Sequence, residues 1–146
     1  MQYADDGRRI YEVHWKTIFV LTKLEKEFLR SHSICRIASV SPNGQPHNVP
    51  IGYSLDDQYF YLTTDPGTVK LSNIRYNQKV CLLVDESKKP RRAMVIRGMA
   101  ELIEGGRAFD EAMTVIANQR GWKKKASGEQ VVIRVTPSRK SSWGLD

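Results

Sequence analysis

The sequence predicts a mainly β protein, in which about six antiparallel strands close into a barrel flanked by three short helices. Six segments are rich in β-branched, aromatic and other apolar residues and are separated by turn-forming residues, a pattern typical of strands. They are 34–40, 47–55, 59–64, 79–85, 93–103 and 131–135. Only three segments place apolar residues at helical spacing, and all are short. Closing the sheet removes its exposed edges, which favours a barrel.

The composition is that of one domain with a surplus of basic residues. A chain of 146 residues can bury a sizeable core, and we expect a single domain over residues 21–146 that follows an N-terminal arm, residues 1–20. The formal net charge of +7 attracts anions, but the charges are scattered, so nucleic acid is not a favoured partner. The densest basic clusters, 88–92 and 123–125, fall in predicted loops without the aromatic residues of a stacking platform.

Nothing in the sequence indicates a metal site, a signal peptide or a membrane span. Cys35 and Cys81 fall in predicted strands without the spacing of a metal motif, and we expect both to be small buried hydrophobes. The N-terminus lacks the apolar run of a signal peptide, and no segment approaches a membrane helix in length. We therefore expect a cytoplasmic protein.

The first helix has a clear start. Thr22 and Glu25 form the pattern of a capping box, in which each side chain satisfies a backbone N–H of the other residue. The helix should end near residues 31–32. Three apolar residues would share its core face: Leu21, Leu24 and Phe28.

The second strand contains two residues that are unusual in a strand interior. The hairpin turn 42–46 precedes it, with Asn43-Gly44 supplying positive φ angles. Pro50 and Gly52 then interrupt the strand 47–55. Such residues mark a bulge, an edge or a place where another group comes close to the backbone.

The stretch 59–74 has the pattern of a phosphate cradle. An aromatic strand ends in two threonines, Pro66-Gly67 breaks it, and a helix follows with Leu71 and Ile74 at helical spacing. The free N–H groups and the dipole of a helix start favour an anion, while hydroxyl groups and a lysine add donors. The cradle would be formed by Thr63, Thr64, Thr68, Val69 and Lys70.

An ordinary helix start is the alternative for this stretch. Asp65 would be the N-cap and Pro66 the first helical residue, with Lys70 as a solvated side chain. The Asp65 carboxylate would also repel a phosphate at the same helix end. The pattern of this stretch alone leaves both interpretations open.

The later elements are less sharply defined. Periodicity leaves two core-facing sets open for the strand 93–103: Val95, Arg97 and Met99, or Met94, Ile96 and Gly98. Gly105 and Gly106 end that strand, and the third helix follows and ends at Gly121. The last strand is closed by Pro137, which leaves a polar tail around Trp143.

The order and spacing of several motifs together are more specific than any one of them. They are the helix before Ile34, the hairpin 42–46, the segments 61–64 and 68–70, the strand 95–101 and the ending 135–137. In this order they resemble the pyridoxamine 5'-phosphate oxidase-like, FMN-binding split-barrel family, over roughly residues 21–143. The resemblance implies a six-stranded antiparallel split β-barrel, and it favours the cradle over the ordinary helix start.

The resemblance also implies a cofactor site. The cofactor-binding positions carried over from the family are Pro50, Ile51, Gly52, Thr63, Thr64, Thr68, Val69, Lys70 and Trp143. In such proteins the strand with the first three passes its backbone along the flavin ring, and the threonines and the lysine hold the ribityl chain and the phosphate. A C-terminal tryptophan would cover the ring, with packing on the barrel as its alternative. Family members are usually homodimers with the cofactor in the subunit interface, so a second chain should complete the pocket.

The function implied is that of an FMN-binding, flavin-dependent oxidoreductase acting on an unknown small molecule. The oxidases that name the family carry phosphate-binding arginines on the second strand, where this chain has 50–52, so oxidation of pyridoxamine phosphate is not expected. The runner-up is a reductase that uses the deazaflavin coenzyme F420, whose longer anionic tail Arg75 and Arg139 could help to hold. A haem-binding barrel would need an axial histidine, which the C-terminal region lacks. The hypothesis of a non-catalytic basic binding module is supported by the net charge alone.

No catalytic constellation stands out, which suits a cofactor that carries the chemistry itself. Of the three histidines only His47 borders the expected site, and we expect it to be a hydrogen-bonded surface residue. Glu101 and Arg97 could form a cross-strand pair on the barrel wall.

Overall fold

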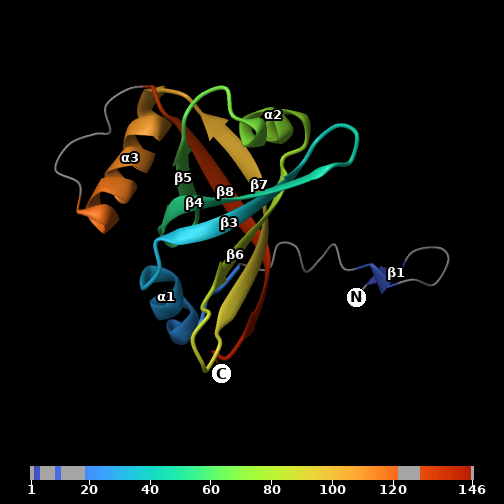
Figure 1. Ribbon diagram of the computed structural model, residues 1–146, viewed down its shortest axis with the longest axis vertical. Helices are drawn as coiled ribbons and strands as arrows, with labels where there is room; N and C mark the ends of the chain where they lie inside the picture. Colours follow the sequence, from blue (N-terminus) through green and yellow to red (C-terminus); the bar gives the residue numbers. More distant parts are fainter. Residues whose placement is uncertain (1, 4–8, 11–18, 122–128, 146) are drawn as a thin grey trace.

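Six antiparallel strands form a closed barrel in the computed structural model, which describes residues 2–3, 9–10, 19–121 and 129–145 (Figure 1). Around the barrel the strand order is β3-β4-β5-β8-β7-β6, and β6 pairs back onto β3. The strands are β3 (Ile34–Val40), β4 (Pro46–Leu55), β5 (Phe60–Thr64), β6 (Lys79–Asp85), β7 (Ala93–Ile103) and β8 (Val131–Trp143). The helices are α1 (Lys23–Arg30), α2 (Val69–Tyr76) and α3 (Gly106–Arg120). The predicted fold class is confirmed.

Two further strands, β1 (Gln2–Tyr3) and β2 (Arg9–Ile10), pair with each other. Most of the predicted arm 1–20 and the basic cluster 123–125 lie outside the described residues. None of the helices in the described part of the chain is long and apolar enough to cross a membrane.

One side of each strand fills the barrel, which settles the question left open for β7. Met94 and Ile96 are fully buried, whereas Arg97 is exposed, so the core-facing set is the one that includes Gly98. A Cβ atom on Gly98 would lie 2.6 Å from the carbonyl oxygen of Thr136. Only a glycine fits where β7 and β8 approach so closely.

The two cysteines lie on opposite sides of the barrel wall. Cys35 is buried in the core, as predicted. Cys81 is only half-buried on the outer side of β6, so the prediction is wrong for it. The inner positions of β6 are taken by Val80, Leu82 and Val84, and successive residues of a strand face opposite sides.

Strand β8 is much longer than predicted, because Pro137 does not end it. The strand continues through Pro137 to Trp143 and pairs with β7 along its whole length. At the proline the register shifts, since Gly98 is opposite Pro137 while Arg97 is opposite Arg139. Ser138 is therefore the extra residue of a β-bulge, and a bulge is one of the places where a strand tolerates a proline.

Helix α1 begins with the predicted capping box. Thr22 N–H donates to Glu25 Oε1 at 2.8 Å, and Glu25 N–H donates to Thr22 Oγ1 at 3.1 Å. The predicted core face is wrong in one residue, because Leu24 is 49% exposed. The buried stripe consists of Glu25, Phe28 and Leu29 instead, which turns Leu24 toward solvent.

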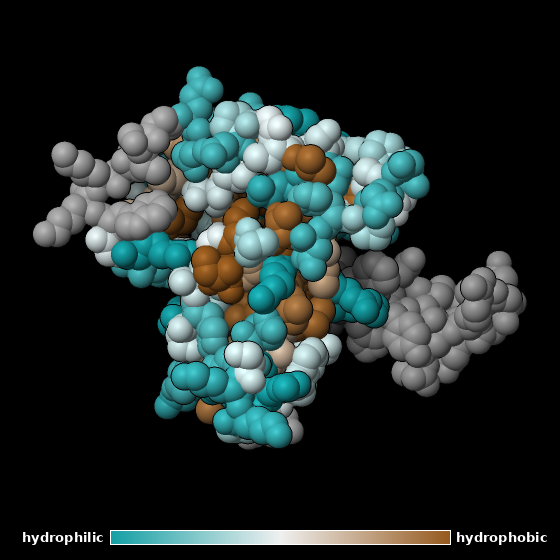
Figure 2. All heavy atoms as spheres, in the orientation of Figure 1, coloured by the Kyte–Doolittle hydropathy of each residue, from teal (hydrophilic) through white to brown (hydrophobic). Residues whose placement is uncertain are grey.

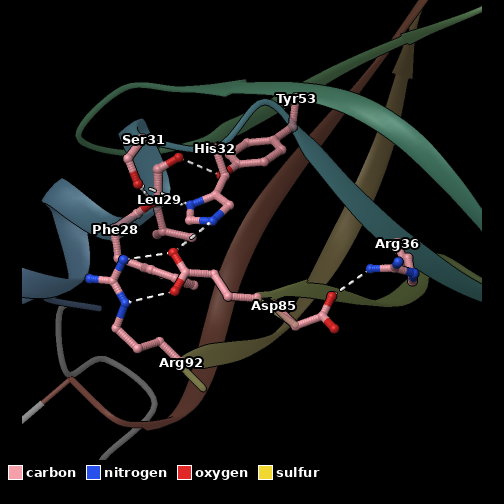
Figure 3. A network of polar contacts seen from close by, with 9 residues as sticks. Phe28, Leu29, Ser31, His32, Arg36, Tyr53, Asp85 and Arg92 are labelled. Atoms are coloured by element: carbon pink, nitrogen blue, oxygen red, sulfur yellow. Dashed lines mark hydrogen bonds and ion pairs between the residues drawn. The ribbon is translucent and has the colours of Figure 1, made fainter. Parts of the chain in front are cut away.

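The C-terminal end of α1 is tied to the loop between β6 and β7 by a polar network (Figure 3). Arg92 donates to both carboxylate oxygens of Glu86, at 2.9 and 2.6 Å, and its guanidinium lies 5.2 Å from the centre of the Phe28 ring. The His32 ring contacts the same carboxylate at 3.1 Å through Nε2. Hydrogen bonding from Arg92 lowers the pKa of Glu86. The network anchors α1 near the end of the barrel where the chain terminates (Figure 1).

Candidate functional site

The first turn of α2 presents unused hydrogen-bond donors. Thr68 is the N-cap residue, but its side chain accepts no backbone N–H, and no acidic residue lies in the first turn. The Thr68 hydroxyl oxygen is shielded from solvent and has no hydrogen-bond partner among the described residues. Lys70, one residue into the helix, makes no ion pair within the same part of the chain. Free amide groups, a hydroxyl and a lysine at one helix start can bind a phosphate group.

The alternative helix start, with Asp65 as the N-cap and Pro66 as the first helical residue, is wrong. Asp65 is not the N-cap, because the chain turns through Gly67, which has a φ of +80°, and α2 begins only at Val69. The Asp65 carboxylate accepts a hydrogen bond of 2.7 Å from the side-chain amide of Gln130. Its charge therefore faces the start of β8 and does not cap the helix.

The end of β5 and the middle of β4 meet at a small cavity. β4 and β5 pair only between 53–55 and 60–62, so Gly52 and Thr63 lie just beyond the last paired residues. Both line a cavity of about 120 Å³, together with Tyr61, Ile116 and Arg120.

Successive residues of β4 and β5 face opposite sides of the barrel wall, so the predicted site residues on these strands are divided between the inside and the outside of the barrel. Thr64 and Ile51 are buried on the inner side, whereas Pro50 is exposed. Thr63 rather than Thr64 lines the cavity, and Ile51 can offer only its backbone to a ligand outside the barrel.

Arg120, which sequence reasoning missed, fills the space in front of Gly52. Its Nη2 donates to the carbonyl oxygens of Tyr53, at 2.6 Å, and Ser33, at 2.8 Å. A Cβ atom on Gly52 would lie 2.9 Å from this nitrogen. The close approach predicted at Gly52 is thus made, in this structure, by the last residue of α3. No local sequence signal could have revealed this role of Arg120, because Arg120 and Tyr53, whose carbonyl oxygen it contacts, are 67 positions apart.

A second polar group stands beside the cavity at the turn between β4 and β5. Tyr61 donates its hydroxyl to Asp56 Oδ2 at 2.8 Å, and burial together with this carboxylate raises the pKa of Tyr61. Arg134 lies 4.6 Å from the centre of the Tyr59 ring and pairs with Glu101 at 3.4 Å. The expected pairing of Glu101 with Arg97 is therefore wrong, because Arg134 is the residue opposite Glu101 on β8.

The remaining predicted site residues are spread over the molecule. Trp143 is 50% exposed at the far end of β8, whereas Thr63 pairs with Val132 near its beginning. The eleven residue steps from Val132 to Trp143 span about 36 Å of strand. Trp143 could reach the cavity only from a second chain. Arg75 is engaged with Glu104 at 2.8 Å.

His47 lies at the start of β4, opposite Ser39. Its Nδ1 is shielded from solvent and has no partner among the described residues. It was expected to be a hydrogen-bonded surface residue, but the described residues give that nitrogen no such bond. The structure places it on the strand of Gly52 but not at the cavity.

Comparisons with known proteins agree with this architecture. A family model described as pyridoxamine 5'-phosphate oxidase matches residues 21–144. A 5a,11a-dehydrotetracycline/5a,11a-dehydrooxytetracycline reductase of Streptomyces rimosus is 28% identical over 133 residues, covering 86% of this chain and 84% of the relative.

Solved structures share the fold. An FAD-binding protein from Mesorhizobium loti is 27% identical and superposes with a TM-score of 0.65, over 84% of this chain and 94% of that one. An F420 reductase is 20% identical and superposes with a TM-score of 0.66, over 84% of this chain and 98% of that one. The family model spans nearly the whole barrel, and the resemblance noted in the sequence is confirmed. This chain belongs to the pyridoxamine 5'-phosphate oxidase family.

Proposed function

We propose that this protein is an oxidoreductase that binds FMN between the start of α2 and the open part of β4. The observation that carries the proposal is the shielded Thr68 hydroxyl, which has no partner among the described residues, at a helix start that also offers Lys70 and has no acidic residue in its first turn. Leaving such a group unpaired costs about 1–3 kcal/mol, so its presence is understandable where a ligand completes it.

The phosphate group of the cofactor would lie at the first turn of α2. The amides that follow Thr68, its hydroxyl and the Lys70 ammonium supply donors and a favourable potential there. Asp65 is held away by Gln130, so its charge does not oppose an anion at this position.

The ring system would lie along β4, where 50–52 have no partner on β5. A bound flavin supplies hydride and electron transfer itself, so the protein's residues bind, orient and shield it. Thr63, which lines the cavity, would bind the ribityl chain, and Arg120 sets a positive charge beside Gly52. That charge would favour electron density on a ring held at this strand.

Reduction of a small organic molecule is the direction we propose for the reaction. The relative from Streptomyces rimosus is a reductase of dehydrotetracyclines, which supports a reductive role without identifying the substrate here. A reductase dependent on the deazaflavin F420 is the second candidate. The observation in its favour is that Arg139, unlike Arg75, makes no ion pair among the described residues and is free to meet an anionic tail.

We further propose a homodimer whose interface is the outer face of β3, β6 and β7. Figure 2 shows apolar surface gathered over the middle of this face. The outward-facing apolar residues there are Ala38, Val40, Cys81, Leu83, Val95 and Met99. Patches of this kind on a small protein commonly mark an interface. Trp143 stands on β8 beside this face, so a second chain could bring it to the cofactor.

Titration of the purified protein with FMN, FAD and F420, followed by fluorescence, tests the proposal. We expect Kd in the micromolar range or below for at least one of them. Lys70→Ala should weaken binding by about 1.5–3 kcal/mol, roughly 10- to 150-fold. Lys23→Ala, at the start of α1, is the matched control and should leave the affinity unchanged. Absence of binding, or equal affinity of the Lys70 variant, would show that α2 does not hold the cofactor.

A further inference from the structure

Two arginines face each other on the outer surface of the barrel. Arg97 on β7 and Arg139 on β8 are direct register partners, and both are exposed in the single chain. Arg97 lies opposite Cys81 on the outer β3–β6–β7 face proposed above as the dimer interface. Side chains at such positions have Cβ atoms about 4.5–5.5 Å apart, and like charges placed there destabilise a sheet. Neither guanidinium has an ion pair or side-chain hydrogen bond within the part of the chain that the structure describes.

The β-bulge at Ser138 creates this juxtaposition. Upstream of it Arg134 and Thr136 point outward, whereas downstream of it Arg139 does, because the extra residue reverses the alternation. The Ser138 hydroxyl donates to the carbonyl oxygen of Arg97 at 3.1 Å, which fixes the backbone beneath the pair. Lys140 points to the other side, where its ammonium contacts the Glu25 carboxylate.

The pair borders a mainly polar cavity. Arg97 and Arg139 line a space of about 210 Å³ with Val95, Lys140 and Ser141. The neighbouring residue on β6 is Cys81. Burial raises the pKa of its thiol, and the charge of Arg97 offsets part of this rise. Charges beside partly buried apolar groups are less screened than charges in open solvent.

We propose that Arg97 and Arg139 form an anion site that binds a phosphate or carboxylate group of a small molecule. Two planar guanidinium groups present parallel donors that match the oxygens of such groups, and a bound anion removes the repulsion between them. The pair is separate from the cavity beside Thr63 in the same chain, because Arg139 lies seven residues beyond Val132, the β8 partner of Thr63, about 23 Å along the strand.

Thermal unfolding with inorganic phosphate at constant ionic strength tests the site. Lys70→Ala serves as the background, so that phosphate at α2 does not contribute. In this background we expect phosphate to raise Tm. Arg97→Gln or Arg139→Gln should at least halve the rise, and the double variant should abolish it. Each variant should be at least as stable as its parent at low salt without phosphate, because the repulsion is gone. Arg91→Gln, another exposed arginine, is the control and should keep the full rise.

The origin of the anion is read from cofactor titrations of the same variants with Lys70 restored. A loss of affinity of fivefold or more for FMN, FAD or F420 would assign the anion to a cofactor. Unchanged cofactor affinity with a lost phosphate effect would assign it to another small molecule, and either result supports the site. An undiminished phosphate effect in the double variant overturns the proposal. So does a change from dimer to monomer without any phosphate effect, since the pair would then bind a second copy of the chain. Because phosphate is the probe, failure here leaves the proposed cofactor site untouched.

Discussion

Two threonines are N-cap residues of helices in this protein, and among the described residues only the side chain of Thr22 has a hydrogen-bond partner. Thr22 accepts the Glu25 N–H, whereas the Thr68 hydroxyl accepts no backbone group. Thr22→Val should therefore cost about 1 kcal/mol of unfolding free energy. Thr68→Val should cost nothing or stabilise the free protein, because it removes an unpaired buried hydroxyl.

Urea unfolding of both variants, with and without FMN, measures the difference between the caps. If FMN uses the Thr68 hydroxyl, Thr68→Val lowers the affinity while Thr22→Val does not. A stability loss at Thr68 equal to that at Thr22 would contradict the assignment of Thr68 to ligand binding.

Gly52 provides a second prediction for single residues. A methyl group there would meet Arg120 at 2.9 Å and displace it from the carbonyl oxygens of Tyr53 and Ser33. Gly52→Ala should lower stability by about 1–3 kcal/mol. Gly105→Ala, at an extended residue with nothing near, should change little. In a double-mutant cycle measured by urea unfolding, Arg120→Gln should reduce the cost of Gly52→Ala. Additive effects would show that the two positions do not interact.

Helix α1 is held at both ends by carboxylates, which gives it a predictable response to acid. Burial raises the pKa of Glu25, but hydrogen bonds from Lys140 and Thr22 outweigh it, so the pKa is lowered overall. Arg92 lowers the pKa of Glu86. A carboxyl with a lowered pKa stabilises the fold above its ordinary value of about 4.5, and the contribution is lost as the pH falls through the lowered value.

The free energy of unfolding should therefore decrease as the pH is lowered below about 4.5, and this decrease should be smaller in the variants Glu25→Gln and Glu86→Gln. Urea unfolding at about pH 7 and about pH 3.5 measures this loss of unfolding free energy in the protein and in each variant. Glu111→Gln, which removes an exposed pair with Arg107, should behave like the unmodified protein. Equal losses in all variants would show that α1 is not anchored through these groups.

At the level of elements, local patterns predicted most of the fold. The capping box of α1, the Asn43-Gly44 turn and the Gly121 end of α3 each depend on neighbours in the chain, and each is visible in the sequence. Pro137 was misread because a proline is a local stop signal, while the bulge that accommodates it exists only through pairing with β7. Arg120 was missed because its partners are carbonyl groups of distant strands.

At the scale of the whole molecule, the proposed dimer predicts which surface tolerates a charge. Leu83→Asp, in the middle of the outer β3–β6–β7 face, should convert a dimer into a monomer. Leu24→Asp, at an exposed leucine on the separate surface of α1, should leave the dimer intact. Light scattering coupled to size exclusion measures both masses. A dimer that survives the first change but not the second would place the interface on α1 instead.

The bulge at Ser138 also determines which of the following residues of β8 face the barrel interior. Deleting this one residue would place Arg139 next to Pro137 and still opposite Arg97, so Lys140 would keep facing the interior while Arg139 and Trp143 kept facing outward. A regular ladder that kept Ser138 as a paired residue would instead exchange the two faces of the following segment, and the bond of Lys140 to Glu25 and the outward arginine pair would both be lost. Sequence alignments of such barrels should therefore treat a one-residue gap at this position as the loss of a bulge, after which each residue of the strand keeps its side.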